Sequence, residues 1–191
     1  MSLEALRGYL QVSVAARQTW AAMGTMKSLK TQGYAYECME DYVLVNGEHF
    51  ASAELTPEER DTVLAAARRE SDNFPIKECF RNSMRLVLQD ERFEYAEGYA
   101  HGAVLPVLHG WALLNGKVID LTMRLRDGHG DSVRKQREPW HADRVLGEFP
   151  SERVYYGKRF SRREVLLAMS DPKFTGSFID DWERGWPLLK A

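Results

Sequence analysis

Three residues whose types together support thiol-based acyl chemistry occur in order along this chain of 191 residues: Cys79, His109 and Asp120. A cysteine thiolate can attack a carbonyl carbon, and a neighbouring histidine can take the thiol proton and later return it to a leaving group. An aspartate on the other ring nitrogen fixes the tautomer and orientation of the histidine. These residues form the candidate catalytic site. The structural alternatives are that His109 is a core histidine and that Asp120 caps a backbone N–H.

Cys79 opens a predicted amphipathic helix in the stretch KECFRNSMRLVL, residues 77–88. At the first turn of a helix, the positive end of the macrodipole favours a thiolate over a thiol. The alternative is that Cys79 is a small buried core residue, which is the commoner role of a lone cysteine. Cys38, in the stretch YAYECMEDY, has no such partner residues in the sequence, and we interpret it as structural.

A predicted hairpin brings His109 and Asp120 together. Asn115-Gly116 is a strong signal for a two-residue turn, and it separates the stretches HGWALL and KVIDLT. The cross-strand pairs would then be Leu114 with Lys117, Trp111 with Asp120 and His109 with Thr122. In this register His109 and Asp120 are diagonal neighbours on one face of the hairpin. A turn that is one residue longer or shorter would put them on opposite faces.

These segments resemble the core of the transglutaminase-like branch of the papain-like cysteine protease superfamily. The motifs that carry the resemblance are C-x-x-N at Cys79 and Asn82, YAEGY at residues 95–99, HGW at 109–111 and GKVIDLT at 116–122. The resemblance covers about residues 77–122. It implies a papain-like fold in which Cys79 is the nucleophile, His109 the base and Asp120 the orienting acid.

Three further residues are candidates for oxyanion or substrate contacts: Asn82, Tyr99 and Trp111. The backbone N–H of Cys79 at the helix start is the natural oxyanion donor, with Asn82 as a second candidate. The structural alternatives are that Asn82 is a polar residue near the helix start and that Tyr99 and Trp111 pack on a sheet face.

Cap and periodicity signals predict the helices. A first helix is expected from residue 2 to about 31, with Gly24 as a point of kinking or division and Gly33 as its stop. The capping box of Thr56 and Glu59 predicts a helix over residues 57–71. Another begins near Cys79, and the stretch SRREVLLAMSDP, residues 161–172, predicts a short capped helix that ends before its proline.

Alternating apolar residues predict the strands. A strand pair is expected around Asn46-Gly47, and strands are expected within residues 92–102, 105–122 and 153–160. The predicted fold class is α+β, with a cysteine-led helix packed on an antiparallel sheet. The length fits a single domain over residues 1–191. Its parts would be a mainly helical region (1–72), the cysteine helix and sheet core (73–160), and a C-terminal helix and tail (161–191).

Composition and charge argue against several classes of partner. A net charge of -2 provides no basic footprint for nucleic acid, so no nucleic-acid partner is expected. The N-terminus lacks the charged-then-apolar order of a secretory signal, and no segment approaches the roughly 18 apolar residues of a membrane span. We therefore expect a cytoplasmic protein without a membrane partner. Its two cysteines would be free thiols in a reducing compartment.

The polar stretch 124–144 suggests a metal-dependent hydrolase as an alternative. Together with His101 it supplies histidines and aspartates, at His129, His141, Asp127, Asp131 and Asp143. Their spacing matches no established metal motif, so we expect no metal, and the thiol mechanism needs no cofactor.

The leading expectation is a thiol-dependent hydrolase or acyltransferase with a protein or peptide substrate. Hydrolysis is slightly preferred over acyl transfer because water is always available as the acceptor. The other alternative is a catalytically inactive protein of this fold that acts as a protein-binding accessory or inhibitory factor.

Overall fold

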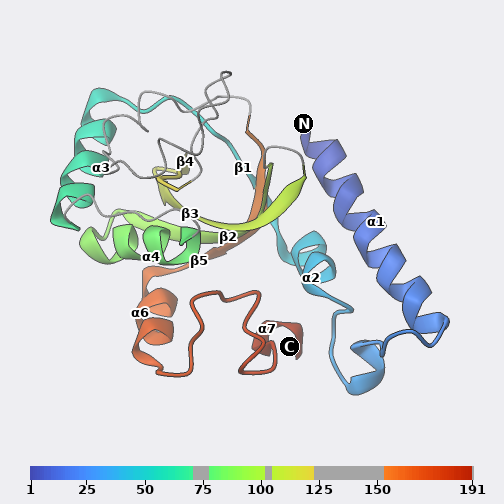
Figure 1. The fold of residues 1–191 in the computed structure, drawn as a ribbon. Coiled ribbons are helices and arrows are strands. Elements are labelled where there is room, and N and C mark those ends of the chain that lie inside the picture. The colour runs from blue at the N-terminus through green and yellow to red at the C-terminus, as the bar shows by residue number, and fades with distance from the viewer. Residues whose placement is uncertain (71–77, 102–104, 123–152, 191) are drawn as a thin grey trace, which may run out of the picture.

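The computed structural model describes residues 1–70, 78–101, 105–122 and 153–190. The architecture is α+β, as the sequence predicts, with helices packed on a curled antiparallel sheet (Figure 1). Within these residues, five strands lie in the order β1 (Glu48–Phe50), β5 (Tyr155–Phe160), β2 (Phe93–His101), β3 (Pro106–Leu114) and β4 (Lys117–Ile119). All neighbouring pairs are antiparallel. In this order β5 lies between β1 and β2.

The sheet curls until its two edges meet. The backbone N–H of Val118 in β4 donates to the carbonyl of Ala51, directly after β1, at 3.3 Å. Gly98 of β2 pairs with Gly157 of β5, and a Cβ on either residue would overlap the backbone of the other. Only glycine therefore permits this close approach of the two strands. The curl gives the sheet an enclosed inner face and a convex outer face.

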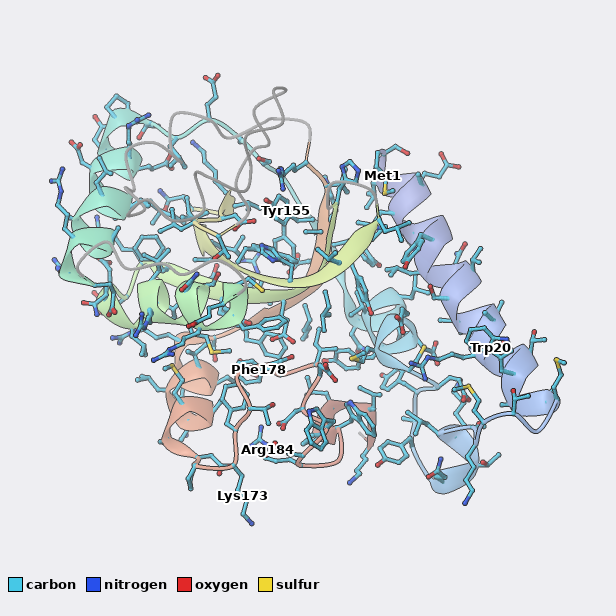
Figure 2. All side chains as sticks on the ribbon, viewed as in Figure 1. Met1, Trp20, Tyr155, Lys173, Phe178 and Arg184 are labelled. Atoms are coloured by element: carbon cyan, nitrogen blue, oxygen red, sulfur yellow. The ribbon has the colours of Figure 1, made fainter. Side chains whose placement is uncertain are left out.

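Each face of the sheet carries its own apolar core. The inner face holds a small cluster formed by Phe50, Ala96, Ala100, Trp111, Leu113, Val118 and Tyr155. The outer face joins the larger core, to which α1 (Leu3–Ala22), α2 (Met39–Asn46), α3 (Pro57–Arg69), α4 (Cys79–Gln89) and α6 (Arg162–Ser170) contribute buried residues. Figure 2 labels Tyr155 on one side of the sheet and Phe178, from the C-terminal segment, on the other.

Side-chain caps set the starts of the predicted helices. Thr56 and Glu59 form a capping box at α3: the Thr56 side chain accepts from the Glu59 N–H at 3.2 Å, and Glu59 accepts from the Thr56 N–H at 2.8 Å. Ser161 and Glu164 make the same box at α6. The predictions of these two helices and of a helix led by Cys79 are confirmed.

The predicted first helix is divided at Gly24, as the sequence allows, and the α-helix itself does not reach residue 31. The Ser2 side chain caps α1, which ends at Ala22 because Gly24 adopts a left-handed backbone with φ of 73°. A short 3-10 helix, η1 (Lys30–Gln32), follows separately. No helix in the described parts of the chain is long and apolar enough to cross a membrane.

The predicted strand pair around Asn46-Gly47 is also wrong. Residues 39–46 form α2, and β1, which follows, pairs with β5 instead of a neighbour across a turn. Gly47 has φ of -84°, so the left-handed conformation of a two-residue turn is absent there. The helix is favoured over a strand because Tyr42 and Val43 pack in the outer core and two acidic residues occupy the positive end of α2.

The hairpin of β3 and β4 has the predicted register. Asn115 and Gly116 both have positive φ, 52° and 77°, and Leu114 pairs with Lys117. The ladder is shorter than expected, because β4 ends at Ile119 and the predicted pairs of Asp120 and Thr122 lie beyond it. A final helical turn, α7 (Pro187–Lys190), lies near the C-terminus.

Candidate active site

His109 and Asp120 meet at the inner face of the sheet, as the hairpin register predicts. His109 lies in β3, and its Nε2 is 2.7 Å from Oδ2 of Asp120. Both side chains are buried, with 4% and 1% of their surface exposed. The carboxylate therefore holds one ring nitrogen of the histidine in an environment that excludes most water.

Cys79 completes the arrangement from the start of α4. Its thiol interacts with the His109 side chain and contributes to the raised pKa of that histidine. Since Asp120 occupies Nε2, Nδ1 is the ring nitrogen left for the thiol. The helix start can reach this point because β4 pairs only with residues 112–114 of β3 and leaves the strand edge beside His109 uncovered by β4.

Close packing fixes the helix against the strand that carries His109. The Ser83 hydroxyl of α4 donates to the carbonyl of Gly110 at 2.9 Å. A Cβ at Gly110 would lie 2.7 Å from the Tyr95 hydroxyl oxygen and 3.0 Å from the Cα of Phe80. The glycine of the HGW motif therefore lets the first turn of α4 lie directly on β3, beside the histidine.

The environment of His109 favours its protonated form. Burial by itself lowers the pKa of the imidazole, but the charge and hydrogen bond of Asp120 outweigh it, with a further contribution from Cys79. Together they raise the pKa of His109 from 6.5 to about 10. At neutral pH these contacts therefore favour the imidazolium form of His109 beside the Asp120 carboxylate.

Asp120 is itself held by several donors, including one that the sequence did not reveal. Tyr155 of β5 donates its hydroxyl proton to Oδ2 of Asp120 at 2.9 Å, and the Thr122 N–H donates to Oδ1 at 3.0 Å. Alternation along β5 places Tyr155 and Tyr156 on opposite faces. Sequence alone could not say which tyrosine faces inward, because that depends on the long-range pairing of β5 with β2.

Asn82 ties the cysteine helix to the aspartate segment. Its Nδ2 donates to the Thr122 hydroxyl oxygen at 2.8 Å, and the residue is 1% exposed. The backbone N–H of Thr122 in turn donates to Asp120. The structure therefore places Asn82, a candidate oxyanion contact, one helical turn from Cys79. Its hydrogen bond to Thr122 holds the start of α4 against the segment that carries Asp120.

Tyr99 is not brought to the site. His109 pairs with Gly98, so Tyr99 projects from the opposite face of the sheet and joins the outer core. Burial there raises the pKa of its phenol, and Glu40 and Cys38 add to the rise. The sequence motif YAEGY placed Tyr99 near the site in the chain, but strand alternation separates it in space.

Trp111 lies at the site but is fully enclosed. It stacks beside His109 with ring centroids 6.4 Å apart and packs edge-on against Phe50 and Tyr155. Its side chain has no exposed surface, and its indole N–H has no hydrogen-bond partner among the residues that the structure describes. These contacts make Trp111 a wall that fixes the histidine ring.

Cys38 is the second thiol of the chain and is deeply buried. It lies at the N-cap of α2, 2% exposed, and burial raises the pKa of its thiol to about 12. A neutral thiol is a poor nucleophile, so Cys38 provides an internal reference for the reactivity of Cys79.

The metal hypothesis rested mainly on residues outside the described part of the chain. Asp127, His129, Asp131, His141 and Asp143 all lie within residues 123–152, while His101 ends β2. Among the described residues, no group of three or more histidine, cysteine or acidic side chains could hold a metal ion.

Comparisons with known proteins identify no relative of this chain. The chain matches no family model, no curated protein and no solved structure. The geometry of the site and the resemblance of its motifs therefore provide the basis for a proposed function.

Proposed function

We propose that this protein is a thiol-dependent hydrolase or acyltransferase that acts on an amide or peptide bond. One observation carries the proposal: the buried His109 is hydrogen-bonded to Asp120 and interacts with Cys79, which lies at a helix start. This arrangement is that of a nucleophile, a base and a residue that orients the base.

The proposed reaction begins with a thiolate of Cys79 and an imidazolium of His109. The sulfur attacks the carbonyl carbon, and His109 gives its proton to the leaving amine as the carbon–nitrogen bond breaks. The resulting thioester is then attacked by water, or by another nucleophile, whose proton His109 accepts. Asp120 stays charged throughout and stabilises the imidazolium.

The start of α4 is suited to stabilise the negative oxygen that forms during the attack. Its N-cap residue, Glu78, makes no side-chain cap, whereas Ser2, Thr56 and Ser161 cap α1, α3 and α6. The first N–H groups of a helix have no acceptor within the helix. The N–H of Cys79 is therefore the proposed oxyanion donor, aided by the helix dipole.

The fold supports a papain-like core as part of the proposal. A cysteine-led helix packs on an antiparallel sheet, and the next two chemical groups come from successive segments of that sheet. This is the arrangement that the transglutaminase-like resemblance implies. We propose a protein or peptide substrate, with water preferred as the acceptor and no cofactor in the reaction.

The proposal predicts that Cys79 reacts much faster than Cys38. With iodoacetamide at pH 7, we expect Cys79 to be alkylated at least about tenfold faster than Cys38, measured by peptide mass spectrometry. The ester p-nitrophenyl acetate should release p-nitrophenolate in a burst and leave one acetyl group on Cys79. The burst should disappear in Cys79→Ala and persist in Cys38→Ala.

If both cysteines are alkylated at similar rates and Cys79→Ala retains the burst, the thiol mechanism is wrong. The catalytically inactive, protein-binding alternative would then be the better interpretation of this fold.

A further inference from the structure

We infer that Tyr155 is a positioning residue of the proposed site, which holds the Asp120 carboxylate for His109. This inference rests on the proposed function and extends it to a residue in a distant strand. The Tyr155 hydroxyl and the His109 Nε2 contact the same oxygen of Asp120, at 2.9 Å and 2.7 Å. A tyrosine that donates to this oxygen fixes where the histidine finds its acceptor.

Asp120 needs such support because it lies outside the regular ladder. β4 ends at Ile119, so the backbone at Asp120 is not held by strand pairing. Its side chain is almost fully buried, and a buried carboxylate is stable only when donors satisfy it. Thr122 donates to Oδ1, while Tyr155 and His109 share Oδ2, so the carboxylate is oriented from both ends.

Tyr155 is placed rigidly enough for this role. Its ring packs edge-on against Trp111 with centroids 5.1 Å apart, and 1% of its surface is exposed. Burial and the nearby Asp120 charge raise the pKa of its phenol, so the hydroxyl stays protonated and can donate across the neutral range. The curl of the sheet lets this residue of β5 reach across the inner face to Asp120, which follows β4.

The neighbouring tyrosine offers a matched control. Tyr156 projects to the outer face, where its hydroxyl donates to the carbonyl of Leu44 at 3.3 Å. The substitutions Tyr155→Phe and Tyr156→Phe each remove one hydroxyl from a buried ring of the same strand. Only the first removes a donor to Asp120.

In Tyr155→Phe, we expect the rate constant of acylation at saturating p-nitrophenyl acetate to fall about tenfold, with KM unchanged. In the wild type, proton NMR should show a downfield, slowly exchanging signal from the His109 Nε2–H, because Asp120 holds this proton. This signal should broaden or vanish in Tyr155→Phe. Both readouts should be unchanged in Tyr156→Phe.

A double-mutant cycle separates positioning from packing. If Tyr155 acts through Asp120, adding Tyr155→Phe to Asp120→Asn should cause little further loss of acylation rate. Fully additive effects, or a His109 signal that survives in Tyr155→Phe, would overturn the inference. If Cys79→Ala reacts as fast as the wild type, the proposed function fails. The NMR signal still decides whether Tyr155 positions Asp120 for His109.

Discussion

Replacing Asp120 with asparagine should slow the acylation of Cys79 by p-nitrophenyl acetate at least about 100-fold. Asparagine has nearly the same shape, but it removes the charge that stabilises the His109 imidazolium. Its amide can also present a donor where the histidine needs an acceptor. Stopped-flow release of p-nitrophenolate measures the effect. Asp61→Asn, on the exposed side of α3, is the control and should leave the rate unchanged.

The same variant should change how stability depends on pH. In the folded wild type the pKa of His109 is raised from 6.5 to about 10, so the folded state holds this proton more tightly than the unfolded state. The resulting stabilisation is fully present below pH 6.5 and is lost as the pH rises to about 10. Without the Asp120 charge, the pKa of the buried histidine should fall.

Urea unfolding at several pH values measures this difference. The free energy of unfolding of Asp120→Asn should be furthest below that of the wild type at pH 6, and the gap should narrow towards pH 10. The corresponding gap for Asp61→Asn should stay small and constant. A gap that does not vary with pH in Asp120→Asn would contradict the assigned coupling of His109 and Asp120.

Glu97→Gln should be the most destabilising of the substitutions considered, lowering the free energy of unfolding by about 2–4 kcal/mol. Glu97 is fully buried on the outer face. Its carboxylate oxygens accept hydrogen bonds from the hydroxyls of Tyr95 and Ser177 and from the N–H groups of Phe178 and Ile179. Burial raises the pKa of its carboxyl, while these four donors oppose the rise. A glutamine would turn its own N–H protons towards some of them.

Thermal and urea unfolding measure this loss, and limited proteolysis should cut the variant near residues 177–179 first. Glu94→Gln is the matched control, because Glu94 lies in the same strand but is partly exposed and pairs with Arg159 at the surface, at 2.9 Å. We expect it to cost less than about 1 kcal/mol. Equal stability of the two variants would show that the C-terminal segment does not depend on Glu97.

The sequence predicted those elements whose determinants are local. The capping boxes of α3 and α6 and the turn at Asn115-Gly116 each involve residues a few positions apart, so their geometry follows from the chain itself. The hairpin register also predicted that His109 and Asp120 share a face. This is why two of the three candidate catalytic residues could be placed relative to each other from sequence alone.

Three failures involve contacts between distant segments. Asn46-Gly47 has the same turn signal as Asn115-Gly116, yet packing of α2 in the outer core makes the first pair a helix end. The role of Tyr155 could not be predicted, because its contact with Asp120 depends on the place of β5 in the sheet. Tyr99 was misplaced because a motif near the site in sequence need not share its face.

The place of β5 also bears on when the site can form during synthesis. β5 lies between β1 and β2, so the N-terminal strand cannot join the sheet until residues 155–160 are present. The same segment brings Tyr155 to Asp120. Such non-local pairings form late in folding. A nascent chain that already contains Cys79, His109 and Asp120 therefore lacks the Tyr155 contact of the proposed site until residues 155–160 have been synthesised.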